Sequence, residues 1–391
     1  MNNAVIIDAI RTPSGKNGGK LADWHPASLA AHVLQALATR NPIDVETIDD
    51  VIMGCVMQVG PQTLNVARNA VLTAGWPEAV PATTVDRQCG SSQQAIHFAA
   101  QGVMSGAYDA VVAGGVEVMS QVPLGASLVQ GMGFPFPPSM LERYAETGLP
   151  AQGIGAEMIA DEWGLSRADL DAFGALSQQR AARATAEGRF KREVVAVPIN
   201  TEGGEESMVL DEGIRPDTTA EKLASLKPAF KEGGKLTAGN SSQIADGASA
   251  VLIMNEEKAK ALGLRPRARF HAFALAGTDP VTMLKGPIPA TRKILEKSGL
   301  SIGDIDLFEV NEAFASVVLA WQKETGADMN RVNVNGGAIA LGHPLGASGS
   351  RLMSTLLCEL ERTAGRYGLQ VMCEGGGLAN ATIIERIESW K

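Results

Sequence analysis

Three glycine-rich turns carry the residue types that nucleophilic acyl transfer needs. They are Arg87-Gln88-Cys89-Gly90-Ser91-Ser92, Gly342-His343-Pro344-Leu345-Gly346 and Cys373-Glu374-Gly375-Gly376-Gly377. A thiolate is a strong nucleophile, an imidazole can remove the thiol proton, and a second thiol can carry another proton. Glycine lets backbone N–H groups approach a reacting oxygen. The set predicts acyl transfer through a thioester on a cysteine.

Cys89 is the predicted nucleophile. It follows the strand-like run 81–86 and precedes a helical run, so its sulfur is expected at a helix N-terminus, where the dipole lowers a thiol pKa. Cys55 and Cys358 lie within apolar runs and are interpreted as buried and inert. The cysteines have no C-x-x-C spacing, and with only 5 histidines no metal site is expected.

His343 and Cys373 are the predicted proton-transfer residues. Glycine lies on both sides of the His343-Pro344-Leu345 run, which leaves the imidazole approachable. The other histidines are interpreted as structural; they are His25, His32, His97 and His271. The amides of the turn after Cys373 can point at an oxyanion. Asn311, at the end of another strand, orients a water, donates directly or marks a strand-terminal turn.

Composition limits the class of protein. The chain has 391 residues, of which 45% are hydrophobic and 20% charged, as in a globular enzyme of two or three domains. Its net charge of −9 argues against a nucleic-acid partner. The first residues enter a strand at once and no apolar run is long enough to span a membrane. We therefore expect a cytoplasmic enzyme with free thiols.

The hydrophobic pattern predicts an α/β fold built from two similar halves. Strands are expected at 4–10, 50–55, 81–86 and 109–113, and helices at about 27–39, 63–74 and 90–105. The last 125 or so residues repeat this order, which indicates an internal duplication. Packed face to face, the halves are expected to bring Cys89 and His343 to one shared crevice.

A segment between the halves breaks the pattern. Residues 131–138, Gly-Met-Gly-Phe-Pro-Phe-Pro-Pro, cannot form regular structure, and Ser166-Arg167-Ala168-Asp169 is a signature for the start of a long helix that stops at Gly188. We interpret the segment as an inserted domain that covers the substrate. The Met- and Pro-rich mouth is either suited to an irregular apolar group or simply a connecting loop.

These motifs together resemble the thiolase family over essentially the whole chain. The shared motifs are Arg11-Thr12-Pro13, Cys89-Gly90-Ser91, Asn311-Glu312-Ala313-Phe314, Gly342-His343-Pro344 and Cys373-Glu374-Gly375-Gly376-Gly377. The resemblance implies a duplicated five-layered α/β/α/β/α fold with an inserted loop domain, coenzyme A thioesters as substrates, no other cofactor, and a homodimer or homotetramer. The expected domains are 1–118, completed by about 247–265, then 119–246 and 266–391.

The resemblance also implies the role of each catalytic residue. Cys89 is the residue that becomes acylated, and His343 is the base that activates it. Cys373 moves the proton at the α-carbon of acetyl-CoA. Asn311, through a water, and His343 bind the enolate oxygen, while the amides of Cys89 and Gly375 hold the tetrahedral oxyanion.

For coenzyme A, the resemblance implies a binding loop at 237–242 and several side chains around it. The expected contacts are Arg215 near the adenine nucleotide, Ser242 near the pantetheine amides with Ala238 in the same loop, Phe230 and Phe314 beside the ligand, and Gln152 at the acyl pocket.

The chain departs from the acetoacetyl-specific pattern. It has Ala151-Gln152-Gly153 where those members have His-Met-Gly, and Gln243 where they have glycine. In these features it is similar to actinobacterial thiolases of steroid and branched acyl degradation. We therefore expect thiolytic cleavage of 3-oxoacyl-CoA, giving acetyl-CoA or propionyl-CoA and a shortened acyl-CoA, in the degradation of bulky, steroid-derived or fatty acyl chains.

Three other functions are alternatives to thiolytic cleavage. The first is a biosynthetic acetoacetyl-CoA thiolase condensing two acetyl-CoA, which the pocket around Gln152 and the loop 129–145 would distinguish. A decarboxylating ketosynthase is disfavoured because that class lacks the Cys373-Glu374-Gly375 turn. A non-catalytic carrier of lipid or CoA is disfavoured because it would be expected to have lost at least one of Cys89, His343 and Cys373.

Overall fold

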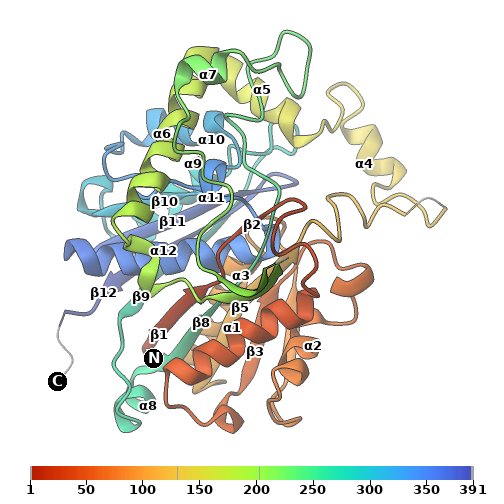
Figure 1. Ribbon diagram of the computed structural model, residues 1–391. Coiled ribbons are helices and arrows are strands. Elements are labelled where there is room, and N and C mark those ends of the chain that lie inside the picture. Colours follow the sequence, from red (N-terminus) through yellow and green to blue (C-terminus); the bar gives the residue numbers. More distant parts are fainter. Residues whose placement is uncertain (1, 130, 202, 389–391) are drawn as a thin grey trace.

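The computed structural model describes residues 2–129, 131–201 and 203–388 (Figure 1). The structure does not describe residues 1, 130, 202 and 389–391. These residues fall within the ranges predicted as domains, and residue 130 also falls within the loop 129–145.

A 10-stranded sheet forms the centre of the fold, in the order β10-β11-β12-β9-β1-β8-β5-β3-β4, with β2 paired to β8. The strands of the first half are β1 (Ala4–Arg11), β2 (Gly15–Lys16), β3 (Asp50–Gly54), β4 (Ala82–Val85), β5 (Ala110–Val118) and β8 (Ala245–Asn255). Those of the second half are β9 (Ala268–Gly277), β10 (Leu307–Val310), β11 (Tyr367–Glu374) and β12 (Leu378–Arg386). A separate pair is formed by β6 (Val197–Thr201) and β7 (Gly204–Met208).

The pairing of strands confirms the predicted duplication. In the first half β3 and β5 are parallel, while β5, β8 and β1 are antiparallel in turn. In the second half β10 and β11 are parallel, while β11, β12 and β9 are antiparallel in turn. The outer strand β4, which pairs in parallel with β3 in the first half, also has a counterpart in the second half. There, an isolated parallel bridge joins Phe308 of β10 to Val332. The halves meet between β1 and β9, through Val5 with Arg269 and Ile6 with Ala268.

Helices complete five layers around the two half-sheets. One outer layer is α1 (Pro26–Arg40) and α2 (Val66–Thr73), the middle layer is α3 (Ser91–Ser105) and α12 (Ser348–Thr363), and the other outer layer is α9 (Pro287–Ser298) and α10 (Ala315–Thr325). Ile96 and Leu356 share the middle core with Ile253 of one half-sheet and Ile384 of the other. Because these strands are buried on both faces, their sequences are nearly continuous hydrophobic runs.

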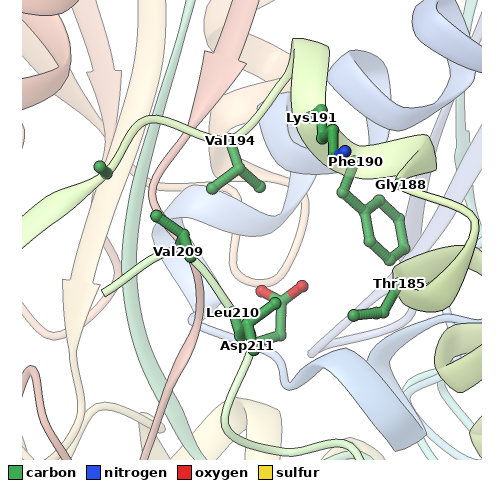
Figure 2. Close-up of a pocket in the computed structure, with 9 residues that line it drawn as sticks. Thr185, Gly188, Phe190, Lys191, Val194, Val209, Leu210 and Asp211 are labelled. Atoms are coloured by element: carbon green, nitrogen blue, oxygen red, sulfur yellow. The ribbon is translucent and has the colours of Figure 1, made fainter. Parts of the chain in front are cut away.

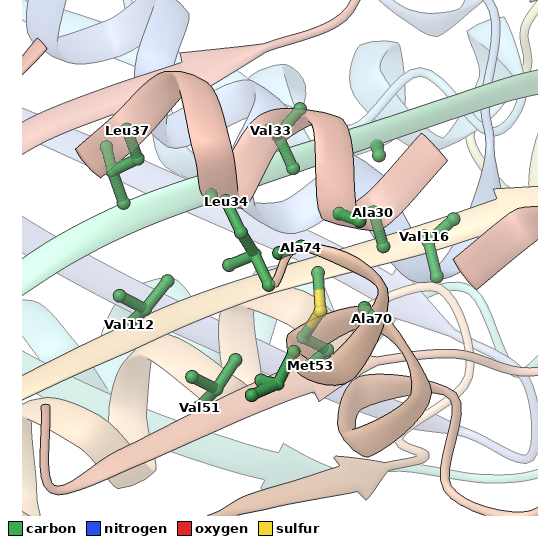
Figure 3. Close-up of a cluster of buried hydrophobic side chains, with 14 of the residues drawn as sticks. Ala30, Val33, Leu34, Leu37, Val51, Met53, Ala70, Ala74, Val112 and Val116 are labelled. Atoms are coloured by element: carbon green, nitrogen blue, oxygen red, sulfur yellow. The ribbon is translucent and has the colours of Figure 1, made fainter. Parts of the chain in front are cut away.

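The outer layer at α1 shows how the sequence pattern becomes packing. Pro26 sits in the first turn and the His25 ring accepts a hydrogen bond from the Ala27 N–H, so the helix begins where its cap lies. The side chains of Ala30, Val33, Leu34 and Leu37, at helical spacing, face Val51, Met53, Val112 and Val116 of β3 and β5 (Figure 3). Each buried aliphatic side chain of this kind contributes roughly 1.5–3 kcal/mol.

The segment between the halves contains α4 (Pro138–Arg143), α5 (Gln152–Glu162), α6 (Arg167–Ala186) and α7 (Ala220–Ala224), and it stands at the top of Figure 1, with α4 away from the body. Ser166 and Asp169 form the predicted capping box of α6, and Gly188 follows its end with φ of +70°. Residues 131–137 form no helix or strand, as predicted, but Pro138, the last residue of that predicted irregular stretch, begins α4. The remaining helices are α8 (Glu256–Ala261) and α11 (Ala338–Leu341).

Two predicted element boundaries were wrong. The strand expected at 109–113 continues to Val118 as β5. The helix expected from about residue 63 begins at Val66, because Leu64 and Asn65 have positive φ and the Asn65 side chain caps the helix by accepting from the Arg68 N–H. In the part of the chain that the structure describes, no helix is both long and apolar enough to cross a membrane.

Candidate active site

Cys89 lies in a tight turn between β4 and α3. Gln88, the residue before it, has φ of +48°, a left-handed conformation uncommon outside glycine. The Ser91 hydroxyl holds the turn, because it accepts from the Arg87 N–H at 2.9 Å and donates to the Gln88 carbonyl at 2.6 Å. A Cβ on Gly90 would overlap the side chains of Glu374 and Asn380. Glycine after Cys89 therefore lets the two halves approach each other closely.

His343 is held from its backbone and from its ring. Its N–H donates to the Gln243 carbonyl at 2.9 Å, while the Gln243 side chain donates to the carbonyl of Ile339 at 2.7 Å. The ring Nδ1 is 2.6 Å from the Ser348 hydroxyl, which itself donates to the Pro344 carbonyl at 2.8 Å. Because the hydroxyl proton is used there, Nδ1 carries the ring proton and Nε2 has the free lone pair. Nε2 is therefore the ring nitrogen that can accept a proton.

Asn311 and Cys373 complete a buried cluster with Cys89 and His343. The Asn311 Nδ2 is 3.4 Å from His343 Nε2, and the Asn311 side chain lies near the Cys373 sulfur, where it lowers the pKa of that thiol. Cys373 lies near the end of β11, opposite Ala379 of β12. A negative charge on Cys89 raises the pKa of Cys373, so the two sulfurs lie in one site. The structure thus brings together the catalytic side chains that the sequence predicted.

Backbone amides converge on the Cys89 sulfur. The N–H groups of Cys89 and Gly375, together with the Gln152 side chain, lie around the sulfur and favour its thiolate form by lowering its pKa. A Cβ on Gly375 would stand 3.2 Å from the Gln152 amide nitrogen, so α5 of the inserted segment reaches this turn. A negatively charged oxygen that forms next to the Cys89 sulfur can accept hydrogen bonds from the same two amides.

Burial governs the protonation states. It raises the pKa of the Cys89 thiol to about 12, with Glu374 as a further cause, and raises the pKa of Cys373 well above the ordinary value. Burial also lowers the pKa of His343 to about 3. The predicted lowering of the Cys89 pKa by the helix N-terminus was wrong for this structure, because desolvation outweighs it. Thiol and imidazole are both neutral, and Cys89 needs a base to react.

Some of the residues expected to bind coenzyme A lie close together. Phe230 and Phe314 make an edge-to-face contact at 5.5 Å, and the Ser242 N–H donates to the Ala313 carbonyl at 2.9 Å, which places this loop beside the Asn311 strand end. Phe230 is 39% exposed. Ala238 and Arg215 are exposed. The Arg215 backbone N–H donates to Gln178, but no hydrogen bond or ion pair among the described residues joins its side chain to the aromatic pair.

Sequence reasoning missed several residues that hold the site. Ser348 had a signal, its place five residues after His343. Glu117 had none: its buried carboxylate accepts from the N–H groups of Val56, Met57 and Gly346 at 2.9, 3.1 and 2.8 Å. Gln62 donates to it at 2.7 Å. Because Gly346 follows His343 and Glu117 belongs to β5, this carboxylate ties the histidine loop to the first half.

Apolar side chains surround Cys89 on one side; the cluster contains Val56, Met57, Met119, Val122, Leu345, Leu352 and Met372. A separate cavity has a volume of about 250 Å³. Figure 2 shows Phe190 and Thr185 on one side of it and Val209 and Leu210 on the other. Its lining contains none of the catalytic residues. Within the described ranges, no group of three or more His, Cys, Asp or Glu residues is placed to hold a metal ion.

Comparison with known proteins places this geometry in a family. Residues 4–257 match the model for "Thiolase, N-terminal domain", and residues 264–386 match that for "Thiolase, C-terminal domain". The chain is 53% identical to "Steroid 3-ketoacyl-CoA thiolase FadA6" of Mycobacterium tuberculosis, covering 99% of this chain and 95% of the relative. It is 47% identical to "3-ketoacyl-CoA thiolase" of Pseudoalteromonas translucida, covering 99% of this chain and 100% of the relative.

Solved structures agree with the family models. The acetyl-CoA acetyltransferase of Bacillus anthracis is similar with a TM-score of 0.90 and 39% identity, and the human mitochondrial 3-ketoacyl-CoA thiolase with 0.89 and 38%. Each comparison covers 99% of both chains. With both domain models matched and the predicted motifs gathered in one buried cluster, this chain belongs to the thiolase family.

Proposed function

We propose that the protein cleaves 3-oxoacyl-CoA by thiolysis, with coenzyme A as the second substrate and no further cofactor. The observation that carries the proposal is the convergence of two thiols, Cys89 and Cys373, on one buried site with the neutral imidazole of His343. A single nucleophile and base suffice for a hydrolase. A second thiol beside the first serves a reaction in which a carbon also gains or loses a proton.

In the first half of the reaction, His343 Nε2 takes the Cys89 proton and the thiolate attacks the ketone carbon. The alkoxide that forms is held by the N–H groups of Cys89 and Gly375. The bond between the ketone carbon and the α-carbon then breaks, and its electron pair becomes the enolate of acetyl-CoA. Asn311 and the protonated His343 stabilise the enolate oxygen, and Cys373 gives its proton to the α-carbon.

In the second half, the Cys373 thiolate takes the proton of incoming coenzyme A. The coenzyme A thiolate attacks the acyl group on Cys89, and the shortened acyl-CoA leaves. Cys89 departs as a thiolate and recovers its proton from His343. The enzyme returns to its starting state with all protons accounted for.

For the substrate, we propose a bulky, steroid-derived or fatty 3-oxoacyl-CoA and a degradative role, releasing acetyl-CoA or propionyl-CoA. The relatives at 53% and 47% identity are both named 3-ketoacyl-CoA thiolase, and the first is a steroid 3-ketoacyl-CoA thiolase. The short side chain of Ala151 at the start of α5 and the apolar cluster beside Cys89 also support an acyl group larger than acetyl. The biosynthetic alternative is therefore disfavoured.

We further propose a cytoplasmic homodimer or homotetramer with the domains 1–118 (completed by about 247–265), 119–246 and 266–391. The domain division is supported by the end of β5 at Val118 and the return of β8 from Ala245 to pair with it. The four cysteines are free, as suits a reducing compartment. Light scattering measures the assembly directly.

The test of the proposed function is acyl transfer to Cys89. Incubation with a 3-oxoacyl-CoA, without free coenzyme A, is expected to release acetyl-CoA and to add the shortened acyl mass to the peptide that contains Cys89. Cys358→Ala, which changes a cysteine outside the site, serves as the control and is expected to acylate normally. Full acylation of Cys89→Ala would contradict the proposal.

A further inference from the structure

A buried carboxyl group lies beside the turn that carries Cys89 and has no part in the mechanism above. Glu374 is the last residue of β11, directly after Cys373, and is 0% exposed. Its carboxyl lies against Gly90, the residue directly after Cys89, so that a Cβ there would overlap it. The Asn380 amide, which donates to the Gly90 carbonyl at 3.0 Å, borders the same space. Glu374 is thus packed against the turn of one thiol and covalently next to the other.

The surroundings of Glu374 do not support an ionised carboxylate. Neither of its oxygens has a hydrogen-bond partner among the described residues, and the Arg87 Nε nearby is also unpartnered. Two other buried carboxylates of this fold differ. Glu117 accepts from the Val56 and Gly346 amides, and Glu312 accepts from the Ser177 hydroxyl at 2.6 Å and other donors. A carboxylate without such donors is costly to bury, whereas its protonated form is far less so.

The charge of Glu374 and those of the thiols oppose one another. Burial raises the pKa of Glu374 to about 8, with Arg87 lowering it and Asp86 raising it. An ionised Glu374 is in turn among the causes that raise the pKa of Cys89 and of Cys373. The charged and titratable groups around it are therefore Asp86, Arg87 and the two thiols, and at neutral pH the carboxyl is mainly protonated.

We propose that Glu374 is a positioning residue of the reaction, whose protonated form lets either thiol carry the negative charge and whose ionisation opposes both thiolates. It acts through Cys89 and Cys373 rather than on the substrate. The inference rests on the proposed function, because that mechanism leaves Cys373 as a thiolate after the α-carbon is protonated. A neutral Glu374 makes that state less costly, and a charged one places two anions side by side in a buried site.

The sign of the pH effect follows. Below about pH 8 Glu374 is neutral, so no negative charge on it opposes the ionisation of the two thiols. As the pH rises through about 8 the carboxyl ionises, and each thiol becomes harder to deprotonate. The rate of a thiolate reaction therefore rises less steeply above that pH than the tenfold per pH unit expected of an independent thiol.

The test is alkylation of Cys89 by iodoacetamide from pH 6 to 10, read by mass spectrometry of its peptide. The wild type is expected to show a break near pH 8. Glu374→Gln, which keeps the shape without the charge, is expected to lose the break and to react about three- to tenfold faster at pH 9, a shift of up to one pKa unit. Glu374→Asp is expected to retain a break. Glu385→Gln, on the neighbouring strand β12, is the matched control and is expected to follow the wild type.

Equal profiles for the wild type and Glu374→Gln would overturn the proposal, as would slower alkylation of Glu374→Gln at every pH. Should that variant fail to fold, the wild-type profile decides alone, since a single thiol titration without a break near pH 8 contradicts the assignment. Alkylation needs no turnover. A failure here is therefore distinguishable from a failure of the proposed function, which the acylation of Cys89 tests.

Discussion

At the scale of single residues, the site depends on one proton of a serine hydroxyl. Ser348 donates to the Pro344 carbonyl and so can only accept from His343 Nδ1, which leaves Nε2 as the base. We expect Ser348→Ala to lower kcat by about tenfold to a hundredfold, part of what a general base contributes, with little change in KM. Ser354→Ala, a buried serine of the same helix that donates to the Ser350 carbonyl, is the control. An unchanged rate constant for Cys89 acylation in single-turnover experiments would contradict this role.

The low pKa of His343 gives a second prediction at this scale. Because burial lowers that pKa to about 3, the imidazole is already unprotonated well below pH 6. We expect the rate of Cys89 acylation in single turnovers to stay constant between about pH 4.5 and 7, where thiol and imidazole both remain neutral. A fall to half near pH 6.5, the ordinary value for histidine, would show that the imidazole is solvated in the working enzyme.

At the scale of elements, the middle layer sets how close the two halves come. A Cβ on Gly349 of α12 would overlap the Gln93 backbone of α3, and the Ser350 N–H donates to the Ser92 hydroxyl at 3.0 Å. We expect Gly349→Ala to lower the free energy of unfolding by about 1–3 kcal/mol through overpacking. At Gly303 a Cβ would meet only the Ser301 hydroxyl, at 3.7 Å, so Gly303→Ala is the control. Urea denaturation followed by circular dichroism measures both, and equal midpoints would refute the close-packing argument.

At the scale of the whole molecule, the site exists only where the two halves and the inserted segment meet. The β1 and β9 strands join the sheets over a short stretch, and Glu117 of β5 accepts from the Gly346 amide of the other half. Gln152 of the inserted segment reaches the Cys89 sulfur. Substrate specificity is therefore a property of all three parts together.

This arrangement predicts a preference for large acyl groups. With Ala151 and Gln152 in place of a bulky pair, each additional buried methylene of substrate contributes about 0.8 kcal/mol. We expect kcat/KM for a medium-chain or bulky 3-oxoacyl-CoA to exceed that for acetoacetyl-CoA by at least about tenfold, or roughly 1.4 kcal/mol. The double variant Ala151→His with Gln152→Met is expected to narrow the difference. A wild-type preference for acetoacetyl-CoA would favour the biosynthetic alternative.

The sequence by itself determined the residue types, the α/β periodicity and the duplication. Turn glycines and strand-then-helix spacing are local features, so Cys89, His343, Cys373 and the capped helix after Ser166 could be read from short stretches. The family resemblance added the specific roles of Asn311 and Gly375. The roles proposed for these residues stay predictions until they are tested.

Only the tertiary structure decided the electrostatics and the supporting contacts. Burial is set by the packing of both halves, and it reverses the effect that a helix N-terminus alone predicts for the Cys89 pKa. Glu117 and Glu374 lie far in sequence from the loops that they face at Gly346 and Gly90. Contacts of this kind produce no recognisable sequence pattern, because they form only when strands of the two halves end at the same place.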